Sequence, residues 1–386
     1  MKRFKLLEDV EFLHLKLLMT IILLCVFGCL MVFSASSYTC AQKEMYNFDS
    51  MYMLKKQMIF ALAGLGGLFI LQLFPISKLI DRFAILIYAF GYIALFLLLT
   101  PFAISSHGAT RWIRIMGIQF QVAEVVKICV IVILAHMVKK YVKHLSNPKL
   151  TIRMWLAGGV PAILLFAISS DLSSTVVVLA IVFGITYITN NTWKLHLGVA
   201  GVVISVIVAY IMYFAKNLPS PDELEQVSFR IGRIAAWIDP ERYAGDQSYQ
   251  TLNSLYAIGS GGWFGKGIGM SVMKQGHIPE AQNDMIFAIV VEELGIIGGS
   301  VLIGLFVYLL YLLTRISVKA KNLMESTLIL GALIHIGVQS FFNIAVTLNV
   351  LPNTGIGLPF ISYGGTSILC LMVEMAWVYS IAKRAN

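Results

Sequence analysis

Long runs of apolar residues, separated by short polar segments, recur along the whole chain. An α-helix needs about 20 predominantly apolar residues to cross roughly 30 Å of hydrocarbon, so runs of this length predict membrane-spanning helices. Ten such helices are predicted, at 17–37, 57–75, 83–104, 120–138, 154–170, 172–190, 195–214, 285–314, 323–348 and 362–382. The fifth and sixth share only a tight turn around Asp171. We therefore expect an all-α polytopic membrane protein with a single membrane domain over residues 1–386.

A segment of about 70 residues, roughly 215–284, separates the seventh and eighth predicted helices. Its length and mixed polarity predict a loop that carries structure outside the membrane. It begins with the loop-like KNLPSPDELEQ and continues with FRIGRIAAWIDP, whose apolar spacing predicts an amphipathic helix that ends near Pro240. We expect this helix to lie on the membrane surface.

The composition supports a membrane protein, since 58% of the residues are hydrophobic, 13% are charged and the mean hydropathy is +0.82. A net charge of +9 also suits a nucleic-acid binder, but the positions of the basic residues argue against that partner. Of the 29 Lys and Arg residues, 17 fall on the side of the N-terminus and five in the short loops opposite. Since cytoplasmic loops are enriched in Lys and Arg, both termini are predicted to be cytoplasmic and the long loop extracytoplasmic.

Two kinds of site are excluded by spacing. The segment IGSGGWFGKGIG is close to a phosphate-binding loop, but Ser260 stands where G-x-x-x-x-G-K-[ST] requires glycine, and Gly267 stands where it requires a hydroxyl. We interpret its glycines as turn residues and points of close backbone approach. The five cysteines form no readable disulfide framework or paired metal motif, so no metal site is predicted from them.

Ionisable residues inside apolar runs are functional candidates, because a buried charge costs several kcal/mol in hydrocarbon. Glu124 and Lys127 stand three apart and can pair on one helical face, either as a structural ion pair or as the charged wall of a cavity. The eighth predicted helix contains the adjacent Glu292 and Glu293. These two point about 100° apart, so at most one is expected to share a partner with Asp284.

Asp284, at the start of that helix, has two interpretations. It can cap a helix that begins at Met285, or it can exchange a proton at the outer membrane boundary. Substitution separates these roles, because Asn caps a helix as well as Asp but cannot take a proton.

Arginines at helical spacing occur on the predicted outer side, as Arg111 with Arg114 and Arg230 with Arg233. The guanidinium fork suits phosphate oxygens, so these pairs could bind a lipid phosphate or diphosphate. The alternative is a solvated face that pairs with nearby acids such as Asp239.

Five dispersed stretches together resemble one family. They are GATRWIRIMGIQFQVAEVVK, FRIGRIAAWIDP, YQTLNSLYAIGSGGWFGKGIG, IPEAQNDMIFAIVVEELGIIGG and NTGIGLPFISYGGTS, preceded by VFSASS near residue 32. In this order they are similar to the SEDS family of shape, elongation, division and sporulation proteins, whose members include FtsW, RodA and SpoVE. The resemblance implies a ten-helix protein of the bacterial cytoplasmic membrane that polymerises lipid II into peptidoglycan strands at the outer face.

The resemblance also implies a catalytic residue. Asp284 matches the essential aspartate of the family pattern Pro-Glu-Ala-x-Thr-Asp-Phe-Ile-Phe, which is written PEAQNDMIF here. Asn283 and Met285 depart from that pattern, whereas the aspartate is retained.

Substrate contacts follow from the family patterns Arg-Trp-Ile, Ser-Glu-x-x-Lys and Pro-Asp-Leu-Gly and from charged residues of the long loop. Val122 and Ala123 replace a Pro-Ser pair before the glutamate. Ser170 and Ser173 stand where Pro and Gly usually flank Asp171, which leaves the geometry of that turn open. The residues expected to bind substrate are Arg111, Trp112, Glu124, Lys127, Asp171, Arg230, Arg233, Lys266, Lys274 and Glu280.

We expect Asp284 to act as the general base that takes the proton of the acceptor sugar's 4-hydroxyl, with a lipid diphosphate as leaving group. Arg111, Lys127 and basic residues of the loop would offset the charge of the diphosphate. No cofactor is firmly expected, although a divalent cation, Mg²⁺ or Mn²⁺, could share this task through carboxylates and substrate phosphates. The partners that the family implies are lipid II, a class B penicillin-binding protein and other divisome or elongasome membrane proteins.

Two other functions stay open. A lipid II flippase would use the buried charges as walls of a translocation path. A non-catalytic scaffold would tolerate a neutral substitution of Asp284. The quoted motifs are shared by all three branches of the family, so division, elongation and sporulation are not distinguished.

Overall fold

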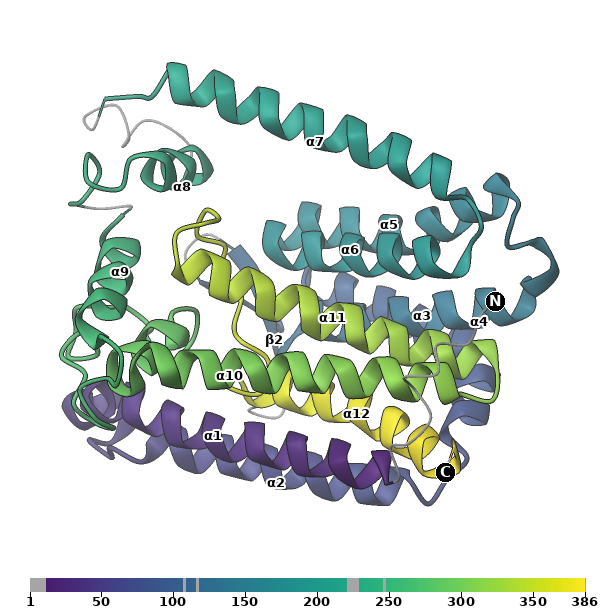
Figure 1. Cartoon of the computed structure of the whole chain (residues 1–386), viewed down its shortest axis with the longest axis horizontal. Coiled ribbons are helices and arrows are strands. Elements are labelled where there is room, and N and C mark those ends of the chain that lie inside the picture. The colour runs from purple at the N-terminus through teal and green to yellow at the C-terminus, as the bar shows by residue number, and fades with distance from the viewer. Residues whose placement is uncertain (1–11, 107–108, 116–117, 221–228, 246–247, 386) are drawn as a thin grey trace.

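The computed structural model describes residues 12–106, 109–115, 118–220, 229–245 and 248–385. Long helices lie side by side in a bundle, with a small sheet and two short helices at one end (Figure 1). The α-helices are α1 (Leu13–Gln42), α2 (Tyr52–Leu71), α3 (Ile76–Leu97), α4 (Val122–Lys140), α5 (Pro148–Ser169), α6 (Leu172–Thr189), α7 (Trp193–Lys216), α8 (Phe229–Ile238), α9 (Tyr249–Gly261), α10 (Ile286–Lys319), α11 (Leu323–Thr347) and α12 (Gly365–Ala385). Two short 3₁₀ helices, η2 (Glu44–Tyr46) and η3 (Val142–His144), lie in the connections.

Nine of the helices in the described ranges are long and apolar enough to cross a membrane, which confirms the all-α polytopic class. The predicted span 120–138 corresponds to α4, which has 19 residues but carries Glu124 and Lys127 and is not among the nine. α4 packs against α3, α6 and α11, so its polar residues are enclosed by protein. The tight turn predicted around Asp171 separates α5 from α6 as expected.

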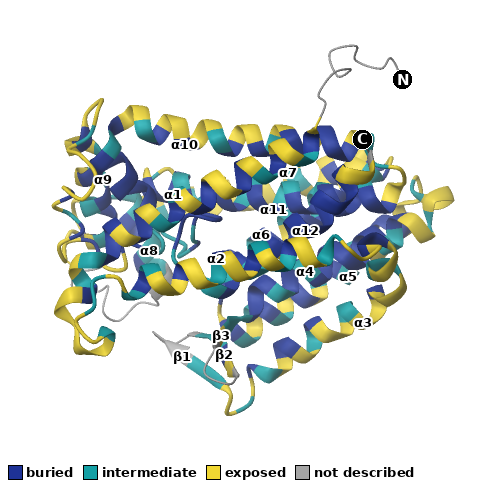
Figure 2. Cartoon of the chain, turned by 90° about the horizontal axis from the view of Figure 1, so that it is seen from below, coloured by how far each residue is buried: buried dark blue, intermediate teal, exposed yellow. Residues whose placement is uncertain are grey.

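The outer surfaces of the helices are apolar. α3 exposes Ile85, Leu86, Phe90 and Ile93, whereas Ala84 and Leu95 of the same helix are buried. Figure 2 shows this division into an exposed and a buried side along most of the helices. Exposed side chains of this kind suit contact with lipid, where a soluble protein would carry polar residues.

A three-stranded antiparallel sheet follows α3, where the sequence predicted a helix through residue 104. α3 ends at Leu97, and the chain then forms β1 (Ala103–Ser106), β2 (Ala109–Ile115) and β3 (Ile118–Gln121) in the order β1-β2-β3. The sequence of β2 and β3 is rich in Thr, Ile, Trp and Phe, which favour strands, and buried Ile113 alternates with exposed Arg114. The apolar run misled the prediction because its last residues belong to the sheet.

α8 confirms the amphipathic helix predicted from FRIGRIAAWIDP, since it ends at Ile238 just before Pro240. α9, which the sequence analysis did not predict, follows it and packs against α10. Both lie at the same end of the bundle as the segment 262–285 (Figure 1).

α10 is broken at Gly295, which has φ 70° and ψ −176°. The segment that follows α9 fills the break and satisfies the backbone groups that the kink releases. These bonds are Ile296 N to Gly262 O at 2.9 Å, Ile297 N to Trp263 O at 3.2 Å, Lys266 N to Glu292 O at 3.0 Å and Gly267 N to Glu293 O at 2.9 Å. A Cβ on Gly265 would lie 2.2 Å from Glu293 O, so the predicted close backbone approach of these glycines is confirmed.

The first and last described helices meet at the opposite end of the bundle. The rings of His14 and Tyr379 lie 5.9 Å apart, and Arg384 Nη2 donates to Ser77 Oγ at 3.1 Å. The two ends of the described chain therefore share one side, which is the arrangement that an even number of crossings predicts. The compartment on that side stays a prediction from the distribution of basic residues.

Candidate active site

A loop between α11 and α12, residues 353–358, forms the floor of the site. Four of its carbonyl oxygens accept hydrogen bonds from side chains of α6, α8 and α11, which fixes its path. The bonds are Arg233 Nη1 to Asn353 O at 3.2 Å, Ser173 Oγ to Thr354 O, Asn343 Nδ2 to Ile356 O at 2.7 Å and Gln339 Nε2 to Gly357 O at 3.0 Å. Three packed helices therefore position this floor, as required of a preorganised site.

Gly355, in the middle of the floor, brings the backbone against two charged side chains. It has φ +73°, and a Cβ built on it would lie 3.3 Å from Asp284 Oδ2 and 4.0 Å from Arg111 Nη1. The carboxylate and the guanidinium therefore converge over the same backbone position. Glycine alone leaves this space open and adopts this φ without strain.

The segment that ends at Asp284 is held through its backbone. The backbone carbonyls of Asp284 and of the two residues before it accept hydrogen bonds from α11 and from the chain just before α12. The bonds are Asn343 Nδ2 to Asp284 O at 2.8 Å, Ser362 Oγ to Asn283 O at 2.6 Å and Tyr363 N to Gln282 O at 2.9 Å. The side chain of Asp284 is thus placed without using its carboxylate.

The capping interpretation of Asp284 is wrong. α10 begins at Ile286, its N-cap residue is Met285, and no side-chain hydrogen bond caps this described helix. The carboxylate is therefore available for another role.

Two arginines and two aspartates gather at the site. Arg111, on β2, places its Nε 3.9 Å from Oδ2 of Asp171, and Arg233 enters from α8. Burial among protein atoms, followed by the neighbouring Glu280, raises the pKa of Asp284 to about 6, against the opposing effect of the two arginines. Burial and the neighbouring Arg111 lower the pKa of Arg233 from its ordinary value. The site is therefore polar, partly buried and electrostatically coupled.

Asp171 keeps a defined turn without the flanking Pro and Gly of the family pattern. Ser170 takes the left-handed position with φ 55°, and Asp171 is the N-cap of α6. Its carboxylate accepts hydrogen bonds from Ser174 N at 3.2 Å and Ser174 Oγ at 2.8 Å. Capping and proximity to Arg111 together fix this carboxylate at the edge of the site.

Buried polar atoms without a hydrogen-bond partner concentrate at this place. Within the described ranges, ten buried side-chain N or O atoms have none, and five belong to the site or its floor. These five are Arg111 Nε, Asn283 Oδ1, Asn343 Oδ1, Asn353 Oδ1 and Thr354 Oγ1. Since buried polar groups are normally paired, this concentration indicates a surface that receives a polar ligand.

A buried polar network lies below the floor. Lys127 Nζ donates to Glu124 Oε1 at 2.6 Å and to Gln339 Oε1 at 2.8 Å, and His335 Nε2 lies 2.9 Å from the same amide oxygen. The predicted pairing of Glu124 with Lys127 is confirmed, and through Gln339 the pair connects to Gly357 of the floor. The network suits a supporting role beneath the site.

The contacts of His335 determine where its protons lie. Gln339 Oε1 must accept, because the Lys127 ammonium can only donate, so His335 Nε2 carries a hydrogen. His335 Nδ1 lies 2.9 Å and 3.0 Å from the two oxygens of Glu374, so one proton bridges the imidazole and the carboxyl group. His335 of α11 and Glu374 of α12 thus form a hydrogen-bonded pair.

Replacing Glu374 by Gln should preserve this bonding, because the amide can donate to His335 Nδ1, whereas Glu374→Leu should destabilise the protein by about 1–3 kcal/mol. Both side chains are fully buried, so Nδ1 of the imidazole in the Leu variant would have neither this partner nor contact with water, although Nε2 would keep its bond to Gln339. Thermal unfolding of the two purified variants in detergent measures the difference. Equal loss of stability in both would contradict the shared proton.

A second group of charges lies apart from Asp284. Lys266 Nζ bonds to Glu292 Oε1 at 2.7 Å, and Lys274 Nζ bonds to Glu293 Oε1 at 2.8 Å. Each glutamate thus pairs with a lysine of the segment 262–285, and neither has Asp284 as a hydrogen-bond partner. The substrate contacts predicted for these two lysines stay a prediction.

Two further predicted substrate residues, Trp112 and Glu280, adjoin residues of the site in the chain or through a hydrogen bond. Trp112 follows Arg111 on β2 and pairs with Ile104 and Gln121 across the sheet. Glu280 is exposed, has φ 52° and accepts a hydrogen bond from Asn283 Nδ2. The side chain of Arg230 lies outside the described part of the structure.

Sequence reasoning missed the residues that build the floor. Gln339 and Asn343 are amides one helical turn apart within an apolar helix, and this spacing was the available signal. Gly355 carried no local signal, because its role depends on Asp284 and Arg111, which are distant in the sequence.

Groups of three or more His, Cys, Asp or Glu residues that could hold a metal ion do not occur among the described residues. The two aspartates of the site lie beside two arginines. This donor set does not fit a metal held by protein ligands alone.

Comparison with known proteins identifies similar chains. A family model described as a cell cycle protein of the FtsW, RodA and SpoVE type matches residues 15–386. The chain is 31% identical to a probable peptidoglycan glycosyltransferase FtsW of Bacillus subtilis, covering 95% of this chain and 89% of the relative. A similar protein of Geobacter sp. strain M18, also called a probable peptidoglycan glycosyltransferase FtsW, is 29% identical, covering 95% of this chain and 96% of that protein.

Solved structures share the fold. One chain, from a study of the structural coordination of polymerization and crosslinking by a peptidoglycan synthase complex, superposes with a TM-score of 0.73 at 21% identity, covering 96% of this chain and 98% of that chain. The crystal structure of RodA from Thermus thermophilus superposes with a TM-score of 0.64 at 21% identity, covering 96% and 97%.

Proposed function

We propose a function for this chain, which belongs to the FtsW/RodA/SpoVE family of cell cycle proteins. It is a peptidoglycan glycosyltransferase and polymerises lipid II at the outer face of the bacterial cytoplasmic membrane. The convergence of the Asp284 carboxylate and the Arg111 guanidinium over Gly355 carries this proposal. A base and a cation at one enclosed place are what transfer of a sugar from a diphosphate to a hydroxyl requires. The names of the FtsW relatives support the same reaction class.

In this reaction Asp284 accepts the proton of the acceptor hydroxyl while the hydroxyl oxygen attacks the anomeric carbon of the donor. A new C–O bond forms, the bond from the anomeric carbon to the diphosphate breaks, and the lipid diphosphate leaves with the bonding electrons. A single displacement inverts the configuration. With its pKa raised to about 6, Asp284 is a stronger base than an ordinary aspartate and is still ionised at neutral pH.

Arg111 and Arg233 are the candidates for binding the leaving diphosphate. Both guanidinium groups act on the Asp284 carboxylate, and the buried Nε of Arg111, although paired in charge with Asp171, makes no hydrogen bond to the described protein. Guanidinium groups in a poorly hydrated site stabilise developing phosphate charge more strongly than they would in water.

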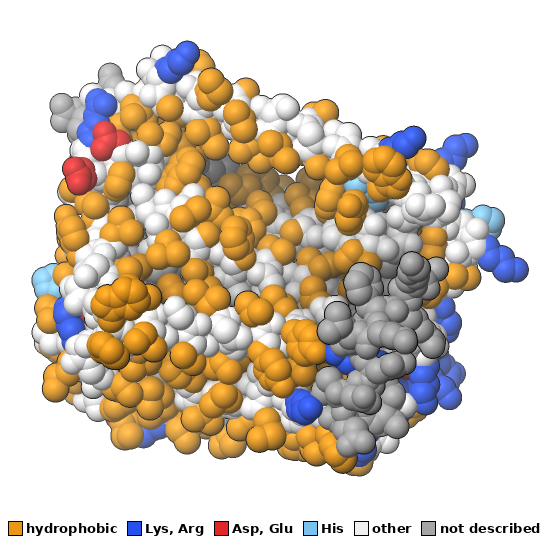
Figure 3. Space-filling model, in the orientation of Figure 1, with side chains coloured by type: hydrophobic (Ala, Val, Ile, Leu, Met, Phe, Trp, Pro, Cys, Tyr) orange, Lys and Arg blue, Asp and Glu red, His pale blue; other side chains and the backbone are white. Residues whose placement is uncertain are grey.

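Besides a site for the diphosphate, the substrate needs an apolar groove for its polyprenyl chain. The only buried residue of α7 is His196, near its first turn, so most of this 24-residue helix stands away from the described body of the bundle. Figure 3 shows a hollow below α7 that is bordered by hydrophobic side chains. We place the lipid chain in this hollow, because an apolar ligand gains about 25 cal/mol for each Å² removed from water.

A divalent cation, if it takes part, would be carried by the substrate. Asp284 and Asp171 could supply one or two carboxylate ligands, and the phosphate oxygens would supply the others, as is common for Mg²⁺. The ion would add positive charge at the diphosphate.

The pH dependence tests the role of Asp284 as base. Because only the ionised carboxylate accepts a proton, kcat/KM for polymerisation should rise about tenfold per pH unit below pH 6 and level off above it. An aspartate with the ordinary pKa of 3.8 would give a flat profile from about pH 5 upward. Initial rates of lipid II polymerisation between pH 4.5 and 8 separate the two curves.

A flippase is the competing function. Lipid II placed on one face of vesicles that contain the purified protein separates the alternatives. Polymer formed with lipid II on the outer-face side supports the proposal, whereas passage of lipid II across the bilayer without polymer would overturn it.

The partners that we propose are a class B penicillin-binding protein and other divisome or elongasome membrane proteins. The fold shared with a chain of a peptidoglycan synthase complex, in which polymerization and crosslinking are coordinated, supports the first of these.

A further inference from the structure

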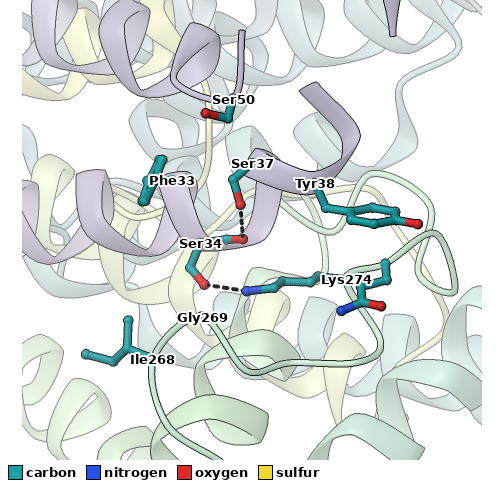
Figure 4. A pocket seen from close by; sticks show the side chains of 9 residues that line it. Phe33, Ser34, Ser37, Tyr38, Ser50, Ile268, Gly269 and Lys274 are labelled. Carbon is teal, nitrogen blue, oxygen red and sulfur yellow. Dashed lines mark hydrogen bonds between the residues drawn. The ribbon is translucent and has the colours of Figure 1, made fainter. Parts of the chain in front are cut away.

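A cavity of about 470 Å³ opens between the last turns of α1 and the segment 268–275. Its volume lies within the range of small-molecule sites, roughly 300–1,000 Å³. None of its lining residues belongs to the Asp284 site or its floor. Figure 4 shows Ser34 of α1 hydrogen-bonded to Lys274, with the hydroxyl of Ser37 directed toward Ser34.

The cavity has a polar floor without net charge. Lys274 is buried, and its Nζ donates to Ser34 Oγ at 2.9 Å and to Glu293 Oε1 at 2.8 Å. Ser34 Oγ in turn donates to Glu293 at 2.6 Å. Because the ammonium and the carboxylate cancel, the floor offers hydrogen bonds but little attraction to a phosphate or diphosphate. It favours an uncharged polar ligand.

The walls combine hydroxyl groups with flat apolar surface. Ser37, Tyr38 and Ser50 contribute hydroxyls and Gln275 an amide, while Phe33 and Ile268 contribute apolar area. A sugar ring presents the complementary chemistry, with hydroxyl and amide groups at its rim and C–H groups on its face. Polar groups at fixed positions within an otherwise apolar pocket are the usual composition of a small-molecule site.

We propose that this cavity is a subsite for uncharged sugar units of the glycan strand that has left the transfer site. The inference rests on the proposed polymerase function and adds a binding site to it. Retention of the strand between additions would let the enzyme make long products before release.

The position of the cavity agrees with this role. Lys274 and Asp284 belong to the same segment, 262–285, at one end of the bundle. Ser50 lies in the connection between α1 and α2 that also carries Tyr46. Burial raises the pKa of Tyr46, and Cys40 and then Glu280 add to this effect, so Tyr46 lies near the glutamate that also acts on Asp284. The cavity and the proposed catalytic carboxylate therefore lie at the same end of the bundle.

Filling the cavity tests the proposal. Ser37→Trp should cause loss of the longest strands when products made from lipid II are separated by electrophoresis at equal substrate consumption. Leu23→Trp is the matched control, because Leu23 lies on the same helix, is 50% exposed and does not line the cavity. Wild-type strand lengths in Ser37→Trp, or equal shortening in both variants, would overturn the subsite.

A second measurement covers the case in which Ser37→Trp does not fold. A maleimide should label the cysteine of the Ser37→Cys variant more slowly in the presence of a soluble glycan tetrasaccharide. Inorganic pyrophosphate should give no protection. Labelling of the wild-type chain measures the background from its native cysteines. Equal labelling with and without the tetrasaccharide would overturn the subsite. If the wild-type protein formed no polymer, the proposed polymerase function would be wrong. The labelling experiment would still measure sugar binding in the cavity independently of that result.

Discussion

Asp284→Asn should lower the rate of lipid II polymerisation by about 10²- to 10⁴-fold, the usual contribution of a general base. Asn has nearly the same shape and keeps the backbone contacts of the segment with Asn343 and Ser362, but its amide cannot accept the proton of the attacking hydroxyl. The measurement is the initial rate at saturating lipid II for purified wild-type and variant protein.

The Asn variant should also fold. Because burial raises the pKa of Asp284 above its ordinary value, ionisation of this carboxylate at neutral pH opposes folding, and a neutral amide removes that cost. Thermal unfolding should therefore show no loss of stability. Asp49→Asn is the control, since Asp49 is a half-buried loop residue paired with Lys55 and lies outside the Asp284 site. If Asp284→Asn polymerised lipid II at the wild-type rate, Asp284 would not be the general base. This result would favour the non-catalytic scaffold function.

Gly355→Ala should lower polymerisation by about 10²-fold, although the change adds one methyl group. The new Cβ would lie 3.3 Å from Asp284 Oδ2, so the carboxylate or the floor must shift, and a displacement of about 1 Å can have an effect of this size. Alanine at φ +73° adds backbone strain of about 1–3 kcal/mol. The initial rate and the thermal unfolding temperature, measured on the same preparation, separate the two effects.

Gly304→Ala is the matched control for this variant. Gly304 lies within α10, and a Cβ there would meet nothing within 4 Å. The substitution should leave activity unchanged and, because alanine favours helix over glycine by about 1 kcal/mol, should not lower stability. A fully active Gly355→Ala protein would show that the space over Gly355 is not the reaction site.

The two groups of carboxylates differ in how completely they are paired, and this difference decides which carboxylate can exchange a proton. Glu292 and Glu293 are adjacent in a membrane helix, yet each is neutralised by a lysine and hydrogen-bonded by Ser271 or Ser34. Asp284 has arginines in its neighbourhood, but no hydrogen bond from another described residue occupies its carboxylate, and its pKa is raised. The carboxylate with the least complete pairing is the one best suited to exchange a proton.

The amino-acid sequence by itself determined the membrane class, most of the helices and the identity of Asp284, Arg111, Glu124 and Lys127 as candidates. The free energy of transferring a helix into lipid is a sum over about 20 consecutive residues. The free-energy cost of burying a charge is large wherever the charge stands. Both signals can therefore be recognised from a local stretch of sequence. The pairing of Glu124 with Lys127 was predictable for the same reason, since one helix supplies both partners.

Only the tertiary structure decided which charges meet and which residues support them. The partners of Asp284 come from β2, α8 and the loop before α12, and His335 finds Glu374 on another helix. The break in α10 likewise depends on the segment after α9, which returns to bond the backbone on both sides of Gly295. Such contacts follow from how helices pack and where loops close, which no window of adjacent residues encodes.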